Sequence, residues 1–549
     1  MHSCTFRMVN FKAGLRALFR TPGFTVVAVL TLGVGIAANA ALFSVYDRLV
    51  LSSVSVPDAS RLVALWSNNP RINFYAPFVS WTRFQELQRY ARSFASMGVS
   101  AADTFTLTGG NQPPDQLTGQ RVSGEFFRTL GILPARGRDF ARDDDVPNGP
   151  NVCIISDTLW TSRFGRSESL VGSVIQLNNQ SWQVVGILPP QLTAPFQQVQ
   201  VFAPRVFEIS LLTPAQIESG AGYSQPIARL ASGVSIDRAQ EELHALAVAY
   251  KQQFGGKIDA DNPAEAREFT DSIVGNLKPT FYTLIGAVGF VLLIACANVA
   301  SLFIGRLNGR QKEIAIRESL GATRRAVVTQ FLAECVLFSA IAGLAGALLA
   351  RMSLSGLRLI VASQVPPNTV FALNWSAWAL IFALTLVSAV LVGLAPAMQA
   401  SKAHLVDVLK DAARGSSSAR GIRVRSILIV VEVAMSVVLL VGSSLLVLSF
   451  LMLQRTPPGF DPAGVATALV GLPPGTYPTK AQQADFFERV IDGLRATPQV
   501  ANASASLGLP AAGFGVRSTY TLLGQPVMPL SQRPLANLQV VSEEYFATL

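Results

Sequence analysis

This chain of 549 residues is 50% hydrophobic and only 14% charged, and its formal net charge is +10 at pH 7. The length excludes a single small domain. A mean hydropathy of +0.38, with a charged fraction far below that of ordinary globular proteins, excludes a purely soluble protein.

The apolar residues are concentrated in five blocks, each long enough to cross a bilayer, which takes about 20 helical residues. The blocks are 24–46, 281–304, 327–350, 375–398 and 427–453. Because they contain almost no charge, five buried core helices are a poor alternative. The first block contains Ala38-Asn39-Ala40, which looks like a signal-peptide cleavage site, but its length favours an uncleaved helix. We therefore predict an integral membrane α-helical protein with five transmembrane helices.

Lysine and arginine residues predict the orientation of these helices. The segment before the first block has four basic and no acidic side chains, and segments 305–326 and 399–426 each have six basic and two acidic ones. All three segments therefore carry +4, which marks the cytoplasmic side. Nucleic-acid binding is a poor explanation of this charge, because no predicted soluble domain is itself basic.

This topology predicts a multi-pass inner (plasma) membrane protein with a cytoplasmic N-terminus and large outer domains. The expected segments are a cytoplasmic 1–22, membrane helices 23–46, 280–304, 327–352, 375–398 and 427–453, outer domains 47–279 and 454–549, an external loop 353–374, and cytoplasmic connections 305–326 and 399–426. Cys153 is the only cysteine expected outside, so no intrachain disulfide is expected there.

The first outer segment has the pattern of an α+β domain. Residues 152–156 and 182–186 are short β-branched runs, and Pro189-Pro190 follows the second. After Ser235 the apolar residues recur at helical spacing, at Ala239, Leu243, Leu246 and Tyr250. Mixed strands and helices without a long polar tract predict a folded domain of two lobes.

A nine-residue segment occurs twice in the chain. Residues 122–130, VSGEFFRTL, recur as 541–549, VSEEYFATL, with six of nine positions identical. Both copies follow a predicted membrane helix on the same side of the membrane. We expect a second outer domain to begin after the fifth block, and the sequence to be truncated within it.

Five motifs carry a family resemblance. They are LRALFRTPGFT at 15–25, WTSRFG at 160–165, VGILP at 185–189 after Gly172, LIACANVA at 293–300 and RQKEIAIRESLGA at 310–322. Together they resemble the MacB/FtsX-like permeases of ABC transporters, most closely the duplicated orphan (ADOP-type) subfamily, over nearly the whole chain. The resemblance implies MacB-like periplasmic core domains with porter-like and β-rich lobes, and a cytoplasmic ABC ATPase as partner.

Catalytic motifs are missing from the sequence. No G-x-x-x-x-G-K-[ST] loop occurs, and Gly256-Lys257 is followed by Ile258, without the required spacing or hydroxyl. His2, His244 and His404 lack metal-ligand spacing, and no G-x-S-x-G motif occurs. We expect no metal, no cofactor and no enzyme, with ATP hydrolysis supplied by a partner.

The motif at 310–322 is the predicted contact with that ATPase. Its expected contact residues are Glu313, Ile316, Arg317, Glu318, Leu320 and Gly321. Glu313 and Arg317 form a favourable i,i+4 pair, Ile316 and Leu320 share a helical face, and Gly321 ends the helix. The alternative is a solvated basic loop. Residues 405–412 are a weaker candidate, which an interfacial helix explains equally well.

Small and polar residues also occur within the membrane blocks. The small residues spaced by four are Gly33, Ala37 and Ala41, and Ala342, Gly346 and Ala350. This spacing allows close helix contact, within one chain or between two chains. The polar residues are Glu334 and Glu432, for which snorkelling or a local Arg partner is favoured over a proton relay, and Asn39 and Asn298, expected to hydrogen-bond between helices.

The predicted function is a mechanotransmission-type permease subunit that couples a partner's ATP hydrolysis to motion of its outer domains, in efflux or in lipoprotein or envelope transport. A non-transport role, as an FtsX-like regulator of an envelope enzyme or as a ligand sensor, fits the same helices and motif. An ion-coupled secondary transporter would need central acids, which the peripheral positions of Glu334 and Glu432 disfavour.

Overall fold

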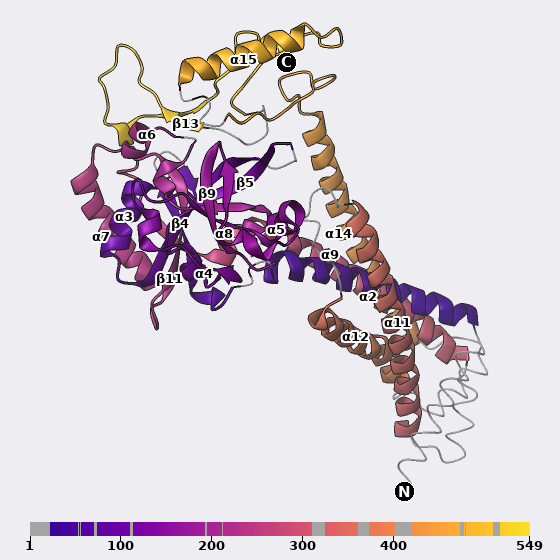
Figure 1. Cartoon of the computed structure of the whole chain (residues 1–549). Coiled ribbons are helices and arrows are strands. Elements are labelled where there is room, and N and C mark those ends of the chain that lie inside the picture. Colours follow the sequence, from indigo (N-terminus) through magenta and orange to yellow (C-terminus); the bar gives the residue numbers. More distant parts are fainter. Residues whose placement is uncertain are drawn as a thin grey trace, which may run out of the picture. The chain divides into compact units, whose positions relative to one another are not determined.

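The computed structural model describes residues 22–309, 324–360, 373–400 and 419–549, apart from 53, 55, 71–73, 110–112, 191, 193–194, 211, 473–476, 478 and 509–515. The chain divides into two compact units. One comprises Met1–Ser52 and Asn276–Thr456 and holds the long apolar helices, and the other comprises Ser53–Gly275 and Pro457–Leu549 (Figure 1).

Five helices contain spans long and apolar enough to cross a membrane. They are α2 (Pro22–Tyr46), α9 (Lys278–Gly309), α11 (Arg324–Ile360), α12 (Trp375–Ala400) and α14 (Ala419–Arg455). Each contains one of the predicted apolar blocks. The expectation of an α-helical membrane protein with five candidate spans is confirmed for the part of the chain that the structure describes.

Four of these helices, α2, α9, α11 and α12, share one apolar core. Phe24, Phe303 and Phe338 meet edge to face in it, with ring centroids 5.1 to 5.8 Å apart. The apolar span of α14, in contrast, has no buried residue. The span Ser426–Arg455 of α14 therefore contributes no buried side chain to this core.

The outer unit is built on a mixed sheet of twelve strands. They are β1 (Leu62–Asn69), β2 (Phe74–Ala76), β3 (Val79–Ser80), β4 (Phe94–Thr108), β5 (Asp115–Val122), β6 (Arg136–Gly137), β7 (Val152–Ile155), β8 (Val174–Leu177), β9 (Gln180–Ile187), β10 (Val201–Ala203), β11 (Gly222–Leu230) and β12 (Ala264–Glu268). The main order is β12-β1-β11-β4-β5-β10-β7-β9-β6. Strand β10 runs parallel to β5 and β7 parallel to β9, whereas the other pairs are antiparallel.

Helices flank this sheet in two lobes, each with its own core. In the first lobe, α3 (Trp81–Tyr90), α6 (Pro214–Glu218) and α7 (Ile236–Phe254) pack on β1, β4 and β11. In the second, α5 (Asp157–Phe164) packs on β7, β9 and β10. A third cluster, with α4 (Phe126–Leu130) and α8 (Phe269–Val274), joins residues of both lobes. Figure 1 shows α3 and α7 together at one end of the sheet and α5 at the other.

The local sequence patterns explain these elements. Helix α7 begins after Ser235, whose side chain accepts a hydrogen bond from the Arg238 N–H, and it buries Ala239, Leu243 and Tyr250. Strand β9 ends at Ile187, before Pro189, which cannot donate a ladder hydrogen bond. The helix and both strands expected in this domain are confirmed.

The second outer segment contains α15 (Lys480–Arg495), a hairpin of β13 (Val516–Thr519) and β14 (Leu535–Leu538), and α16 (Tyr545–Thr548). Its repeat has the same local geometry as the first copy. The Ser123 N–H donates to the Val99 carbonyl (2.9 Å) and its Oγ accepts from the Val99 N–H (3.0 Å). Ser542 makes the same two bonds with Ala505, at 2.9 and 3.0 Å. The duplicated sequence therefore folds into a duplicated structural motif.

Candidate functional site

The predicted ATPase contact lies outside the described residues. Helix α9 ends at Gly309 and α11 begins at Arg324, so Glu313, Ile316, Arg317, Glu318, Leu320 and Gly321 fall in the undescribed interval between them. The weaker candidate, 405–412, falls between α12 and α14 and is also outside the described residues. Both assignments stay predictions.

The small residues of α2 and α11 form one close helix contact within the chain. A Cβ added to Gly346 would lie 3.0 Å from both the Gly33 carbonyl oxygen and Ile36 Cγ2. Ala342 and Ala350 on α11 are fully buried, and Ala37 on α2 is 7% exposed. Of the two interpretations of this spacing, packing within one chain is therefore the one seen.

The polar residues of the membrane helices differ in their hydrogen bonds and in their burial. The Asn39 side chain donates to the Gly35 carbonyl on its own helix and to the Val288 carbonyl on α9, each at 2.9 Å. This confirms the interhelical bond expected for Asn39, whereas none is seen for Asn298 within the described part of the chain. Glu334 is only 3% exposed, which rules out the snorkelling interpretation because its carboxylate is packed among helices.

A hydrogen-bonded cluster joins the outer end of α2 to the start of α12. The Asp47 carboxylate, 8% exposed, accepts hydrogen bonds from the Asn374 amide, Ser376 Oγ (3.4 Å) and Ser52 Oγ (3.3 Å). Asn374 Oδ1 in turn accepts from the Ala377 N–H at 3.0 Å, which caps α12. The sequence reasoning missed this cluster, although Asp47 directly follows one apolar block and Asn374 directly precedes another.

The two connections between the membrane helices and the first outer domain differ: between Leu51 and Ala59 the described residues form no helix, whereas the return path is helical. Helix α2 continues into a π-helical turn at Asp47–Leu51. On the return path, α8 leads through a 3-10 turn at Gly275–Leu277 directly into α9. A helical connection is stiffer than a Gly- or Ser-rich linker and resists bending.

Two buried ionic clusters stabilise the outer domain. Arg83 and Asp259 form an ion pair between Nε and Oδ2 at 3.3 Å, with side chains only 2% and 5% exposed. In the other cluster, Arg121 Nε lies 2.9 Å from Asp103 Oδ2, and the Arg205 guanidinium donates to Asn151 Oδ1 at 2.6 Å. No local sequence signal predicts these pairs, because their members are far apart in the chain.

Cys153 provides a test of the outer-domain core. It is fully buried in β7, and burial raises the pKa of its thiol to about 12. Because only the thiolate alkylates, Cys153 in the native chain should resist iodoacetamide at about pH 8 and react once urea unfolds the domain. The unfolded thiol has a pKa of about 8.5, so the free energy of unfolding should fall as the pH rises above that value. Peptide mass spectrometry measures the labelling; fast labelling of the native chain would contradict the buried position.

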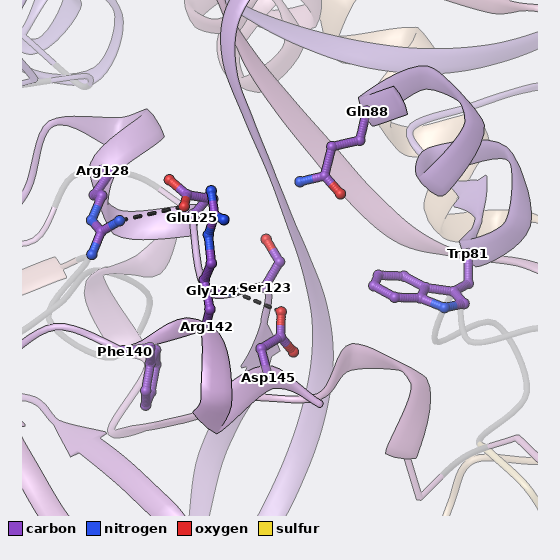
Figure 2. Close-up of a pocket in the computed structure, with 9 residues that line it drawn as sticks. All are labelled: Trp81, Gln88, Ser123, Gly124, Glu125, Arg128, Phe140, Arg142 and Asp145. Carbon is purple, nitrogen blue, oxygen red and sulfur yellow. Dashed lines mark hydrogen bonds and ion pairs between the residues drawn. The ribbon is translucent and has the colours of Figure 1, made fainter. Parts of the chain in front are cut away.

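A cavity of about 410 Å³ lies in the first outer domain. Trp81 and Gln88 of α3 face it from one side, and Ser123, Glu125 and Asp145 face it from the other (Figure 2). Ser123 and Glu125 belong to the first copy of the repeat. The described residues contain no cluster of three or more His, Cys, Asp or Glu side chains able to hold a metal ion.

Two family models match this chain. The MacB-like periplasmic core domain matches residues 25–246, and the FtsX-like permease C-terminal domain matches residues 285–405. Together the two matches include four of the five candidate membrane helices and most of the first outer domain.

Curated relatives are similar over parts of the chain. The macrolide export ATP-binding/permease protein MacB of Campylobacter jejuni is 22% identical over 330 residues, which cover 59% of this chain and 48% of that protein. The uncharacterized ABC transporter permease YknZ of Bacillus subtilis is 27% identical over 293 residues, covering 53% of this chain and 68% of that one. This chain thus spans about half the length of the MacB protein that it matches.

Among solved structures, the periplasmic region of MacB from Actinobacillus actinomycetemcomitans is matched at 15% identity with a TM-score of 0.30, covering 40% of this chain and 94% of that one. The extracellular domain of YknZ is matched at 16% identity with a TM-score of 0.29, covering 38% and 99%. On the two family models, with the five candidate spans and the α+β outer domain, the chain belongs to the MacB/FtsX-like family of ABC transporter permeases, as a membrane protein with an extracytoplasmic MacB-like core domain.

Proposed function

We propose that this chain is a permease subunit in which ATP hydrolysis by a separate cytoplasmic ATPase moves the outer domains. The observation that carries the proposal is the helical continuity of the returning junction, from α8 through Gly275–Leu277 into α9. Because helical structure is continuous from α8 into α9, a tilt of α9 reaches the first outer domain as motion of its attached end.

The packing of the membrane helices supports the same proposal. Helix α2 contacts α11 at Gly33 and Gly346, and Asp47 fixes its outer end to the start of α12. Close-packed interfaces move as units rather than deforming continuously. Motion that starts at the segment between α9 and α11 therefore has a rigid route to α2.

Three further parts of the proposal come from the sequence and the relatives. The basic segments support a cytoplasmic N-terminus and a cytoplasmic 305–326, where an ATPase would bind. The FtsX-like match covers that segment. Relatives named as macrolide exporters support export or efflux as the direction of transport.

The test is the charge reversal Arg317→Glu. The new acidic side chain lies four residues after Glu313, so two like charges face each other on one helical face. This costs only about 0.2–0.5 kcal/mol locally, so membrane insertion should be unaffected. We expect an ABC ATPase to co-purify with the wild-type chain from native membranes in mild detergent, and to be lost or unstimulated with the variant. Mass spectrometry and ATP hydrolysis assays measure both effects.

The matched control is Arg358→Glu, the same reversal near the end of α11 that is expected on the opposite side of the membrane. It should leave the ATPase bound and stimulated. If neither wild type nor variant retains an ATPase although both insert and fold, the coupling proposal fails and the FtsX-like regulator is the remaining function.

A further inference from the structure

The cavity beside α3 has the dimensions of a small-ligand site. Its volume of about 410 Å³ lies within the range of roughly 300–1,000 Å³ that such sites occupy. In Figure 2 the amide of Gln88 and the ring of Trp81 lie across an open space from Ser123 and Asp145. Phe140, which is 1% exposed, adds an apolar side chain to the lining.

The carboxylates that line this cavity already have partners. The two Asp145 oxygens accept the backbone N–H groups of Gly124 (2.8 Å) and Arg205 (2.9 Å). Glu125 forms an ion pair with Arg128 at 3.3 Å. Burial also raises the pKa of Asp145, which weakens its charge as the pH falls. The carboxylate acceptors in the cavity lining are therefore already satisfied by donors of the protein itself.

Some lining groups carry hydrogen-bond donors that no described acceptor uses. Arg142 takes part in no ion pair or hydrogen bond with the described part of the chain, and the same is true of the Gln88 amide. Ser123 Oγ accepts a hydrogen bond from the Val99 N–H, and its own hydrogen is available to donate. A guanidinium, an amide and a hydroxyl at one cavity suit an anionic acceptor, above all a carboxylate.

The two copies of the repeat pair their glutamate differently. In the second copy, residue 547 is Ala where the first has Arg128, and Glu544 pairs instead with Arg495 at the end of α15. The helix before the repeat thus supplies the partner of the glutamate. In the first copy that partner is Arg128, three residues along the repeat itself, so Glu125 forms no ion pair with a described residue of α3.

We propose that this cavity binds a small carboxylic acid with an apolar or aromatic body. Its carboxylate accepts hydrogen bonds from Arg142, Gln88 and Ser123, and its apolar body rests on Trp81. The Trp81 ring is held in place by Phe84 and Phe207, with centroids 5.6 and 5.5 Å away. Ligand binding at this site does not depend on an ATPase partner, so its test is independent of the test of the proposed function.

The test uses hippurate (N-benzoylglycine) and its neutral amide, hippuramide, with the full chain in detergent. A ligand of this size should bind with a Kd of about 1 mM, measured by saturation-transfer NMR or calorimetry. Arg142→Gln should weaken hippurate binding by about tenfold or more, because a hydrogen bond to a charged group is lost. The matched control is Arg89→Gln, on the exposed side of α3 beyond the cavity, which should change nothing.

Three results would overturn the proposal. They are equal binding of hippurate and hippuramide, unchanged hippurate binding by Arg142→Gln, and no hippurate binding up to about 10 mM, which is tenfold above the expected Kd. Protection of Cys153 from alkylation verifies that each variant is folded, so a loss of binding reports the cavity itself.

Discussion

Replacing Asp259 by alanine should destabilise the first outer domain by about 3–5 kcal/mol, because the change leaves the buried Arg83 guanidinium without its counter-charge. The Arg83 side chain is 2% exposed, so water cannot solvate the remaining charge. The Asp259 backbone carbonyl, which accepts from Arg83 at 2.6 Å, survives the change but carries no charge. This is the largest single-residue effect that we expect in the outer domain.

Asp259 also organises the polar groups around it. Its carboxylate accepts from Ser80 Oγ at 2.6 Å and from the Tyr250 hydroxyl at 3.1 Å, while Arg83 lies over the Tyr250 ring at 3.9 Å. Burial, together with the Asp259 charge, raises the pKa of Tyr250, which keeps its hydroxyl a donor at neutral pH. Removing the carboxylate therefore leaves several buried donors unsatisfied at once.

Thermal unfolding of the full chain in detergent measures this effect, with Cys153 alkylation as the reporter of the outer domain. A loss of this size should lower the Tm of the domain by about 10 °C. The matched control, Asp143→Ala, removes an exposed carboxylate that makes no ion pair with any described residue, and should change the Tm little. The double variant Arg83→Met with Asp259→Ala should lose less stability than the two single changes summed, because no unpaired charge remains. An Asp259→Ala Tm equal to wild type would contradict the buried pair.

The features that the sequence predicted correctly depend on local patterns. Residues four or seven apart, such as Ala239, Leu243 and Tyr250, fall on one face of a helix wherever that helix packs. Apolar length alone indicates a membrane span. The repeat of 122–130 at 541–549 needed only comparison of the sequence with itself, and its hydrogen bonds follow because equal sequences favour equal turns.

The features that the sequence could not predict depend on contacts between distant residues. Arg83 and Asp259 are 176 positions apart, and Asp47 and Asn374 are 327 apart, so no periodicity relates them. The cavity is also of this kind, because its lining comes from α3 and from the repeat, which β4 and β5 separate in the sequence. The small-residue spacing at Gly33 and Gly346 indicated close packing but not the partner, since a helix surface carries no information about which helix will cover it.

Replacing Gly346 by leucine should separate α2 from α11 and destabilise the membrane core by about 1–3 kcal/mol or more, the usual cost of overpacking a filled site. Backbone atoms leave little room for a side chain at Gly346, because its Cβ would already lie 3.0 Å from the Gly33 carbonyl oxygen. Alanine adds one methyl group, which the neighbouring atoms can accommodate by moving a few tenths of an ångström. The loss of stability should therefore increase from alanine through valine to leucine.

The matched series is placed at Gly289 on α9, where an added Cβ has no neighbour within 4 Å. All these side chains are apolar, so membrane insertion should be equal at the two positions, and only the Gly346 series should lower the Tm in detergent. An equal fall in Tm in the Gly289 series would mean that side-chain volume anywhere in the membrane helices, rather than the α2–α11 contact, determines stability.

The Gly346 series also tests transmission through the membrane core. If α2 carries motion from the cytoplasmic segment to the outer domain, stimulation of the partner ATPase should fall in the same order as the Tm, because both depend on the α2–α11 contact. Lowered Tm with unchanged stimulation would assign that contact a purely structural role and leave α9, which is continuous with α8, as the route to the outer domain.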